Sequence, residues 1–198
     1  MEECIVYRWH GEPPQLHSAQ WEQVRSLPIN RIPWPGYAEH IHTFVRLALT
    51  DTGIVARFET DEKPLLAQKN QPHSMVCQDS CMEFFFRSEQ SMRYVNIEIN
   101  PIGTIYADFD HQPLPLDAET LHLESRITPQ KWYLQYEVPF SLLEECFGPV
   151  GNCLYANFYK CGDLTEHPHY FCWNEIDGSR FSFHQPENFG KLILCREQ

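Results

Sequence analysis

The sequence predicts an all-β fold, namely an antiparallel, jelly-roll-like β-sandwich of roughly ten strands with one short helix. Three observations lead to this fold class. Polar and apolar residues alternate with a period of two over most of the chain, turn residues interrupt the alternation at short intervals, and one segment alone has a strong helical pattern. The 198 residues, 42% of them hydrophobic, suit one core between two sheets, so we expect a single domain over residues 1–198.

Residues 1–41 are expected to be an irregular lead-in that wraps the sandwich. Their prolines, which continue up to the segment Ile32-Pro33-Trp34-Pro35-Gly36, exclude long helices and favour turns and extended chain. A short helix is expected from Ser18 to Arg25, because Ser18 can cap its first turn and Trp21 and Val24 fall on one face.

Two hairpins follow the lead-in. The first joins the apolar positions Val45, Leu47 and Leu49 to Ile54, Ala56 and Phe58 through the turn Asp51-Thr52-Gly53. The second pairs residues 82–87 with residues 93–100 through a turn at 88–91. Asn100-Pro101-Ile102-Gly103 then turns the chain again, and residues 104–109 are expected to form a third strand of this meander.

The second half of the chain supplies the remaining elements. Residues 110–120 are rich in proline and acidic side chains and are expected to form a surface loop. After them we expect a hairpin of residues 121–127 and 131–138, a helix over 139–147 that ends at Gly148-Pro149, and strands at 152–160, 170–173 and 191–195.

The charge of the chain limits its partners. It has 15 Lys and Arg against 27 Asp and Glu, a net charge of −12, and its basic residues are scattered singly, so we expect neither nucleic acid nor membrane as a partner. A neutral saccharide ligand is compatible with this charge. The N-terminus lacks the features of a signal peptide, and no apolar run reaches the roughly 20 residues of a membrane helix, so we expect a cytoplasmic protein.

The eight cysteines are expected to be mostly free thiols, because disulfides are rare in a cytoplasmic protein of this size. Cys77 and Cys81 are close in sequence, and Cys153, Cys161 and Cys172 share a region with His167 and His169. No Cys-x-x-Cys pair is present to anchor a zinc site, so these cysteines are interpreted as small buried residues and not as metal ligands.

Two predicted strands carry a polar face. On residues 93–100, Val95, Ile97 and Ile99 point to one side, which leaves Tyr94, Asn96, Glu98 and Asn100 on the other. Tyr155, Asn157 and Tyr159 lie in the same way opposite Leu154, Ala156 and Phe158. Amides and carboxylates bind sugar hydroxyls, and aromatic rings stack on the C–H face of a pyranose. The alternative is that both strands are ordinary solvated strands.

Five segments in a fixed order resemble the family 9-like carbohydrate-binding modules. They are Gln78-Asp79-Ser80-Cys81-Met82-Glu83-Phe84-Phe85, residues 96–106, residues 157–163, His169-Tyr170-Phe171-Cys172-Trp173-Asn174 and residues 183–190. The resemblance covers residues 40–195 and implies a jelly-roll-like sandwich, related to the DOMON group, that binds sugars on aromatic platforms and sometimes holds structural calcium. Oxygen ligands for calcium are available at Asp61, Glu62, Asp108 and Asp110.

The resemblance and the polar strands together predict a binding site. Trp173 is similar in context to one of the two tryptophans that sandwich a terminal sugar in the xylanase-attached modules of this family. The other predicted ligand-binding residues are Asn96, Glu98, Tyr159, Arg180 and His184. The second tryptophan has no counterpart before Asp79, and Trp34 of the lead-in is one substitute for it. By strand parity, Trp173 can equally pack into the core.

These residues predict a noncatalytic carbohydrate-binding protein and not an enzyme. The chain contains no Gly-x-Ser-x-Gly elbow, P-loop, dinucleotide-binding glycine pattern or His-Glu-x-x-His motif. Glycosidase chemistry would need a pair of carboxylates, which spacing in the sequence does not identify. The alternative function is a structural or protein-interaction sandwich that has lost its sugar site.

Overall fold

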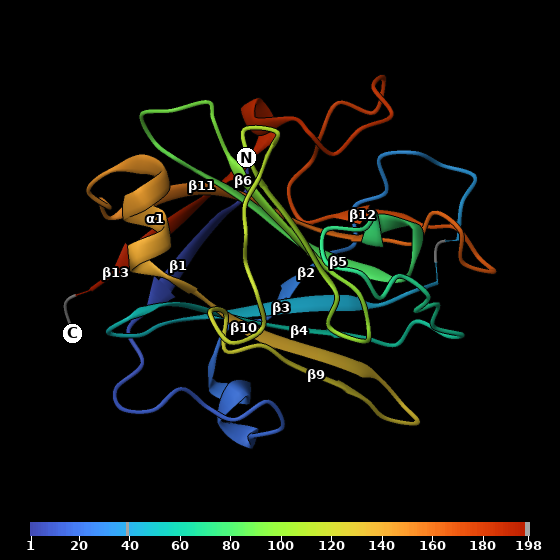
Figure 1. The fold of residues 1–198 in the computed structure, drawn as a ribbon, viewed down its shortest axis with the longest axis horizontal. Coiled ribbons are helices and arrows are strands. Elements are labelled where there is room, and N and C mark those ends of the chain that lie inside the picture. Colours follow the sequence, from blue (N-terminus) through green and yellow to red (C-terminus); the bar gives the residue numbers. More distant parts are fainter. Residues whose placement is uncertain (39, 197–198) are drawn as a thin grey trace.

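The computed structural model describes residues 1–38 and 40–196 and places two β-sheets face to face (Figure 1). The strands are β1 (Glu3–Tyr7), β2 (Leu27–Pro28), β3 (Thr43–Leu49), β4 (Gly53–Thr60), β5 (Cys81–Ser88), β6 (Val95–Ile99), β7 (Ile105–Phe109), β8 (Gln112–Pro113), β9 (Glu124–Ile127), β10 (Trp132–Pro139), β11 (Cys153–Cys161), β12 (Tyr170–Cys172) and β13 (Gly190–Cys195). The helices are α1 (Phe140–Phe147) and the 3-10 helices η1 (Ala19–Gln23), η2 (Val76–Gln78) and η3 (Pro186–Asn188). The predicted β-sandwich is confirmed.

The eight-stranded sheet has the order β1-β13-β11-β5-β6-β7-β8, with β12 paired to β11. The five-stranded sheet has the order β2-β3-β4-β10-β9. Between named strands the pairing is antiparallel except for β1 and β13, which run parallel with Glu3 opposite Lys191 and Tyr7 opposite Cys195. The lead-in is therefore less irregular than predicted, because it adds β1 to one sheet and β2 to the other. Similarly, the predicted loop at 110–120 contains β8.

The core between the sheets consists of the apolar positions that the period-two alternation identifies. Val45, Leu47 and Phe58 on the five-stranded sheet belong to the same buried cluster as Ile97 and Phe158 on the eight-stranded sheet. The hairpin of β3 and β4 has the predicted turn, with Leu49 opposite Ile54. Each strand thus turns alternate side chains inward, as the pleat requires.

The lead-in covers the outer face of the five-stranded sheet. Trp21 of η1 is 1% exposed and packs on Ala48 and Val55. Its indole N–H donates to Gln135 Oε1 at 3.1 Å. The hydroxyl of Ser18 accepts from the backbone N–H of Gln20 at 3.2 Å, so Ser18 caps this helix as predicted. This contact fixes the lead-in against the sandwich.

Long loops cover the outer face of the eight-stranded sheet. A second buried cluster lies there, in which Phe85, Tyr94 and Tyr159 from the sheet pack with Trp34 from the lead-in and Phe183 from the loop after β12. In Figure 1 the blue lead-in and the orange segments around β12 lie side by side, and Arg31 forms an isolated bridge with Cys172. The predicted polar strand face is therefore buried and not solvated.

A buried ion pair joins the two sheets. Lys160 of β11 points inward, and its ammonium lies 2.6 Å from Oε2 of Glu62, two residues after the end of β4, with side-chain exposures of 0% and 3%. The Lys160 ammonium also donates to His169 Nε2 at 2.8 Å, and Ser80 donates to Glu62 Oε1 at 2.6 Å. Burial, followed by the Lys160 charge, lowers the pKa of His169 to about 3. The imidazole is therefore a neutral acceptor for the Lys160 ammonium.

Helix α1 lies at one end of the sandwich and is half-buried through Leu142 and Leu143. It ends at Gly148, which has φ of 76° and whose N–H donates to Glu144 O at 2.9 Å. Glycine adopts this left-handed conformation without steric cost. Within residues 1–38 and 40–196, no helix has the length and apolar character needed to cross a membrane.

Gly190 is a point of close approach between β13 and a core ring. A Cβ at this position would lie 2.6 Å from Trp173 Cζ3 and 3.0 Å from the backbone oxygen of Glu2. Gly190→Ala is therefore expected to lower the free energy of unfolding by about 1 to 3 kcal/mol, because the added methyl group forces the Trp173 ring or the backbone to shift. Chemical denaturation measures this loss. Gly151→Ala is the control, since a Cβ there meets nothing within 4 Å, and equal losses in both variants would contradict the close approach.

Candidate ligand-binding pocket

A pocket opens on the outer face of the eight-stranded sheet, between the sheet and the loops that cover it. Its cavity is about 270 Å³, slightly below the range of roughly 300 to 1,000 Å³ that is typical of small-molecule sites. Its lining consists of the aromatic residues Trp34, Tyr170, Phe181 and Phe183 and of Cys77, Glu83, Glu98, Cys161, Asp163, Ser182 and His184. The pocket therefore suits a small ligand with both apolar and polar faces.

Trp34 holds the aromatic part of the pocket together. Its ring stacks on Phe183 with centroids 5.2 Å apart at 27°, and it meets Phe181 at 4.4 Å. Its indole N–H donates to Gly178 O at 3.1 Å. Trp34 itself is 8% exposed, whereas Phe181 is 60% exposed. Phe181 is therefore the lining ring that presents most of its surface to a ligand.

Two carboxyl groups form the floor of the pocket. Glu83 on β5 and Glu98 on β6 are direct cross-strand partners and are 2% and 6% exposed. Burial raises the pKa of Glu83 to about 7, and burial together with the Glu83 charge raises the pKa of Glu98 well above its ordinary value. Asn96 donates to Glu98 Oε1 at 3.0 Å and thereby orients it. Protonation of one of the two carboxyls is enough to avoid two negative charges side by side.

The pocket has no basic counterpart to these acids. Asp163 adds a third carboxyl, whose pKa burial raises, and no Lys or Arg belongs to the described lining. His184 is the one imidazole in the described lining, and its Nδ1 is 2.6 Å from the Tyr94 hydroxyl. Burial, followed by the charge of His111, lowers the pKa of His184. An anionic ligand would therefore find no positive charge in the lining.

Thiols lie beside the carboxyl floor. The Cys161 thiol donates to Glu83 Oε1 at 2.9 Å, and Cys77 lines the pocket nearby. Burial raises the pKa of all three local thiols, that of Cys81 to about 12. Without a further partner they are protonated and unreactive near neutral pH.

The structure brings four of the six predicted site residues to the pocket or directly behind it. Glu98 and His184 line it. Asn96 lies behind Glu98, and Tyr159 supports Phe183, because its hydroxyl donates to Phe183 O at 3.1 Å and its ring stacks on Phe183 at 4.2 Å. Asn96 and Tyr159 thus position lining residues instead of lining the cavity themselves.

Trp173 and Arg180 lie outside the lining. Trp173 is 4% exposed within the core between the sheets, where its ring packs on Phe158 at 5.5 Å. This position matches the alternative that Trp173 packs into the core and leaves the ring little free face for a ligand. Arg180 is half-exposed and is engaged by Asp177 and Glu187.

The oxygens considered for calcium do not converge. Each is engaged by a different partner: Asp61 by His42, Glu62 by Lys160, Asp108 by Tyr106 and Asp110 by Arg93. Calcium needs several oxygens directed at one point. The described structure therefore gives these four residues no common cation site.

Sequence reasoning missed most of the aromatic lining. Phe181, Phe183 and Tyr170 are on or beside an irregular loop, where no periodicity indicates which way a side chain points. The outward direction of Glu83 could have been predicted from the sequence, because Glu83 lies between the core residues Met82 and Phe84 on β5. Its cross-strand pairing with Glu98 depends on the register, which the sequence pattern leaves open.

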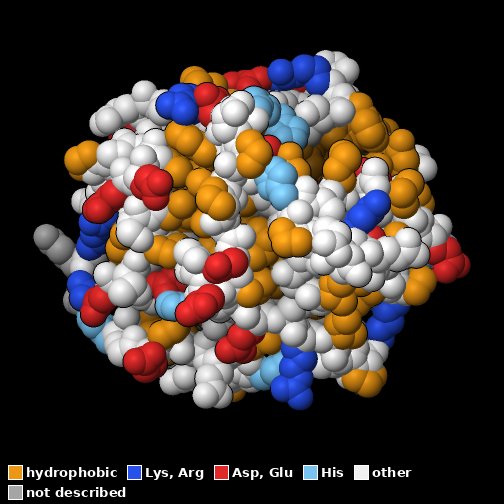
Figure 2. Space-filling view, viewed as in Figure 1, with side chains coloured by type: hydrophobic (Ala, Val, Ile, Leu, Met, Phe, Trp, Pro, Cys, Tyr) orange, Lys and Arg blue, Asp and Glu red, His pale blue; other side chains and the backbone are white. Residues whose placement is uncertain are grey.

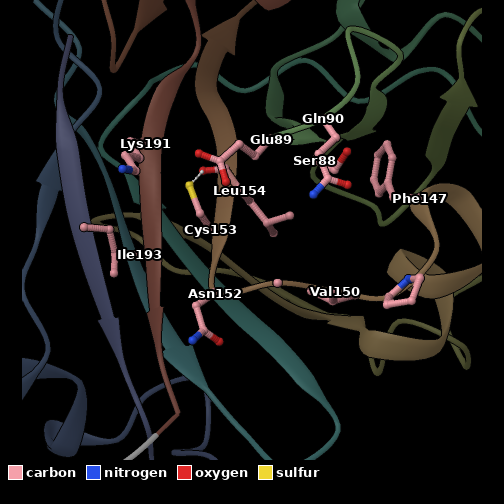
Figure 3. A pocket seen from close by; sticks show the side chains of 12 residues that line it. Ser88, Glu89, Gln90, Phe147, Val150, Asn152, Cys153, Leu154, Lys191 and Ile193 are labelled. Atoms are coloured by element: carbon pink, nitrogen blue, oxygen red, sulfur yellow. Dashed lines mark hydrogen bonds between the residues drawn. The ribbon is translucent and has the colours of Figure 1, made fainter.

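A second cavity, of about 320 Å³, lies beside the end of α1 (Figure 3). In the view, Phe147 lies on the opposite side of the cavity from Lys191 and Ile193, and a dashed line joins Cys153 Sγ to Leu154 O. Phe147 is the one aromatic ring in its described lining. This cavity is larger, but it lacks the stacked rings and the paired buried carboxyls of the first pocket.

The surface is acidic overall and has dispersed positive charge. Figure 2 shows one face, on which single Lys and Arg side chains are separated from one another and acidic side chains are more numerous. No basic stripe crosses the face that is shown. This distribution matches the net charge of −12.

Three solved structures resemble the chain over nearly its whole length. A candidate carbohydrate-binding protein from Bacteroides uniformis superposes with a TM-score of 0.82 at 23% identity, covering 98% of this chain and 99% of that one. A family 9 carbohydrate-binding module from Caldicellulosiruptor kristjanssonii in complex with cellotriose has a TM-score of 0.73 at 14% identity, with coverages of 100% and 95%. The same module in complex with glucose gives 0.73 and 14%, with coverages of 100% and 97%. At these identities the likeness establishes the fold.

The family assignment rests on the sequence. None of the curated proteins compared with the chain matches it significantly. The model of carbohydrate-binding family 9 matches residues 14–113 and 116–194, which is most of the chain and includes every residue that lines the pocket. The chain belongs to carbohydrate-binding family 9.

Proposed function

We propose that this chain binds a saccharide, without catalysing a reaction, in the pocket lined by Trp34, Phe181 and Phe183 above Glu83 and Glu98. The observation that carries the proposal is the meeting of exposed and stacked aromatic rings with buried carboxyls in one small cavity. A pyranose needs both, because its C–H face stacks on a ring while its hydroxyls form hydrogen bonds. Membership of carbohydrate-binding family 9 supports the same ligand class.

The absence of Lys and Arg from the described lining favours a neutral saccharide over a uronic acid. The Caldicellulosiruptor module is in complex with glucose and with cellotriose, so gluco-configured sugars are the first ligands to test. A glycan array followed by titration calorimetry makes this test. If no saccharide binds with millimolar or better affinity, the alternative of a structural or protein-interaction sandwich is favoured.

A hydrolytic role fits the geometry less well. Cross-strand partners such as Glu83 and Glu98 project side by side from one face of a sheet, so both carboxyls approach a ligand from the same side. Glycosidases instead place their two carboxyls on either side of the scissile bond, about 5 to 10 Å apart. The pair is therefore assigned to hydrogen bonding with hydroxyl groups.

Phe181→Ala is expected to weaken saccharide binding by about 1 to 2 kcal/mol, or roughly five- to thirtyfold, because it removes the most exposed ring of the lining. Calorimetry with the best saccharide from the array measures the loss. Tyr7→Ala is the matched control, since Tyr7 is 54% exposed on β1 and outside the pocket lining. Equal affinities for the two variants and the unmodified chain would place the saccharide elsewhere.

A further inference from the structure

Two thiols and a carboxyl converge beneath the pocket floor. Cys81 of β5 and Cys161 of β11 are direct cross-strand partners, and Glu83 is two residues from Cys81 on the same strand. One ligand atom from each of the three residues lies within 4.8 Å of the other two. Over residues 1–38 and 40–196, this is the one group of three or more His, Cys, Asp or Glu side chains that meets such a distance.

The convergence follows from the strand register. Successive residues on a strand alternate between faces, so Cys81 and Glu83 point away from the core while Met82 points into it. Cys161 points to the same outer face from the neighbouring strand. All three atoms are thus held by paired backbone, and a cation would not need to order a flexible loop around itself.

The three side chains are strongly shielded from solvent. Cys81, Cys161 and Glu83 are 0%, 2% and 2% exposed. They already interact, since the Cys161 thiol donates to Glu83 Oε1 at 2.9 Å. Buried sulfur and carboxyl ligands at fixed positions are typical of cation sites with high affinity, because their arrangement precedes binding.

The donor set distinguishes between cations. Thiolates favour soft or borderline cations, whereas calcium and magnesium prefer oxygen ligands alone. Zn²⁺ binds a mixture of sulfur and carboxylate ligands in tetrahedral geometry. Cys161 and Glu83 also line the pocket, so a cation bound to them has a fourth position that faces the cavity.

We propose that Cys81, Glu83 and Cys161 bind one Zn²⁺ ion at the floor of the pocket, with the fourth position open to the cavity. Binding forms two sulfur–zinc bonds and one oxygen–zinc bond, and the two thiol protons, together with any proton held by the Glu83 carboxyl, pass to solvent. This inference does not depend on the saccharide proposal, because no sugar takes part in it.

The first experiment measures zinc and cobalt binding by the tag-free chain, kept reduced with a phosphine. We expect about one Zn²⁺ per chain by elemental analysis after removal of unbound metal. Co²⁺ in the same site is expected to give the intense near-ultraviolet band of thiolate-to-cobalt charge transfer. Failure of the folded chain to retain zinc, or a cobalt spectrum without this band, would overturn the proposal.

The second experiment assigns the ligands. Cys81→Ala and Cys161→Ala are each expected to lower zinc affinity at least about a hundredfold, since even the loss of an outer hydrogen-bonding partner costs ten- to a hundredfold. Cys172→Ala is the matched control, because Cys172 is 1% exposed in the same buried cluster but outside the group of three. The cobalt band should persist in the control and disappear in the other two.

A folding defect is separated from ligand loss by three measurements. Circular dichroism checks each variant, and Cys81→Ser and Glu83→Gln provide smaller changes that should also weaken zinc binding. Zinc should raise the melting temperature of the unmodified chain and of Cys172→Ala alone. Unchanged zinc affinity in the folded Cys81 and Cys161 variants would refute the site.

Discussion

Trp173→Ala is expected to lower the free energy of unfolding by about 3 to 5 kcal/mol. The ring is 4% exposed in the core between the two sheets, where it packs on Phe158 and closely approaches Gly190. Its removal leaves a large cavity that the surrounding strands can close only in part. Chemical denaturation measures this loss, and Trp9→Ala provides a comparison, because Trp9 is half-buried at the edge of a satellite cluster.

The saccharide affinity of Trp173→Ala provides the second readout. Because Trp173 lies outside the pocket lining, a folded Trp173→Ala chain should retain most of its saccharide affinity. The opposite pattern, with stability close to that of the unmodified chain and affinity abolished, would return Trp173 to the role of a stacking platform. Phe181→Ala should leave the stability close to that of the unmodified chain and weaken saccharide binding, because Phe181 is exposed within the lining.

Lys160→Met is expected to destabilise the protein by about 3 to 5 kcal/mol, because it leaves the Glu62 carboxyl buried without its ammonium partner. Methionine approximates the length and volume of the lysine stem, so the loss reports charge and hydrogen bonding more than a cavity. His169 Nε2 remains directed at the missing ammonium, while Ser80 still donates to Glu62 Oε1. Urea unfolding followed by circular dichroism measures the change.

Two further variants test whether the loss of stability comes from the buried charge of Glu62. Arg8→Met breaks the exposed ion pair of Arg8 with Asp51 and should cost far less, because solvent and salt screen exposed pairs. Adding Glu62→Leu to Lys160→Met removes the orphaned charge and should recover part of the stability. If the single Lys160 variant were as stable as Arg8→Met, the buried ion pair would contribute no more to the free energy of unfolding than the exposed pair.

Much of the fold was predictable because strand alternation is a local property. The hairpins and α1 follow from short stretches of sequence in which each side chain has one of two faces. Which segments cover a face of the sheet depends instead on contacts between distant parts of the chain. Strand alternation predicts that Asn96 and Glu98 point away from the core. They do so, but they are buried because loops from distant parts of the chain close over them.

The site was only partly predictable for the same reason. Strand parity and the family resemblance together predict Glu98 and His184 as site residues. Trp34 joins the lining from a lead-in more than forty residues before Glu83, and no pattern in the sequence encodes that contact. Cys81 and Cys161 became neighbours through the register of β5 and β11, which is set by the whole sheet.

The parallel pairing of β1 with β13 has a mechanical consequence. The chain enters β1 at one end of this strand pair and leaves β13 at the other, with Glu3 opposite Lys191 and Tyr7 opposite Cys195. A stretching force applied through the two ends of the chain would slide the strands along each other, so all hydrogen bonds between them would bear the load together. An antiparallel pair loaded at adjacent ends would instead open one bond at a time. The edge of the eight-stranded sheet is therefore arranged to resist extension in shear, as a molecular clamp.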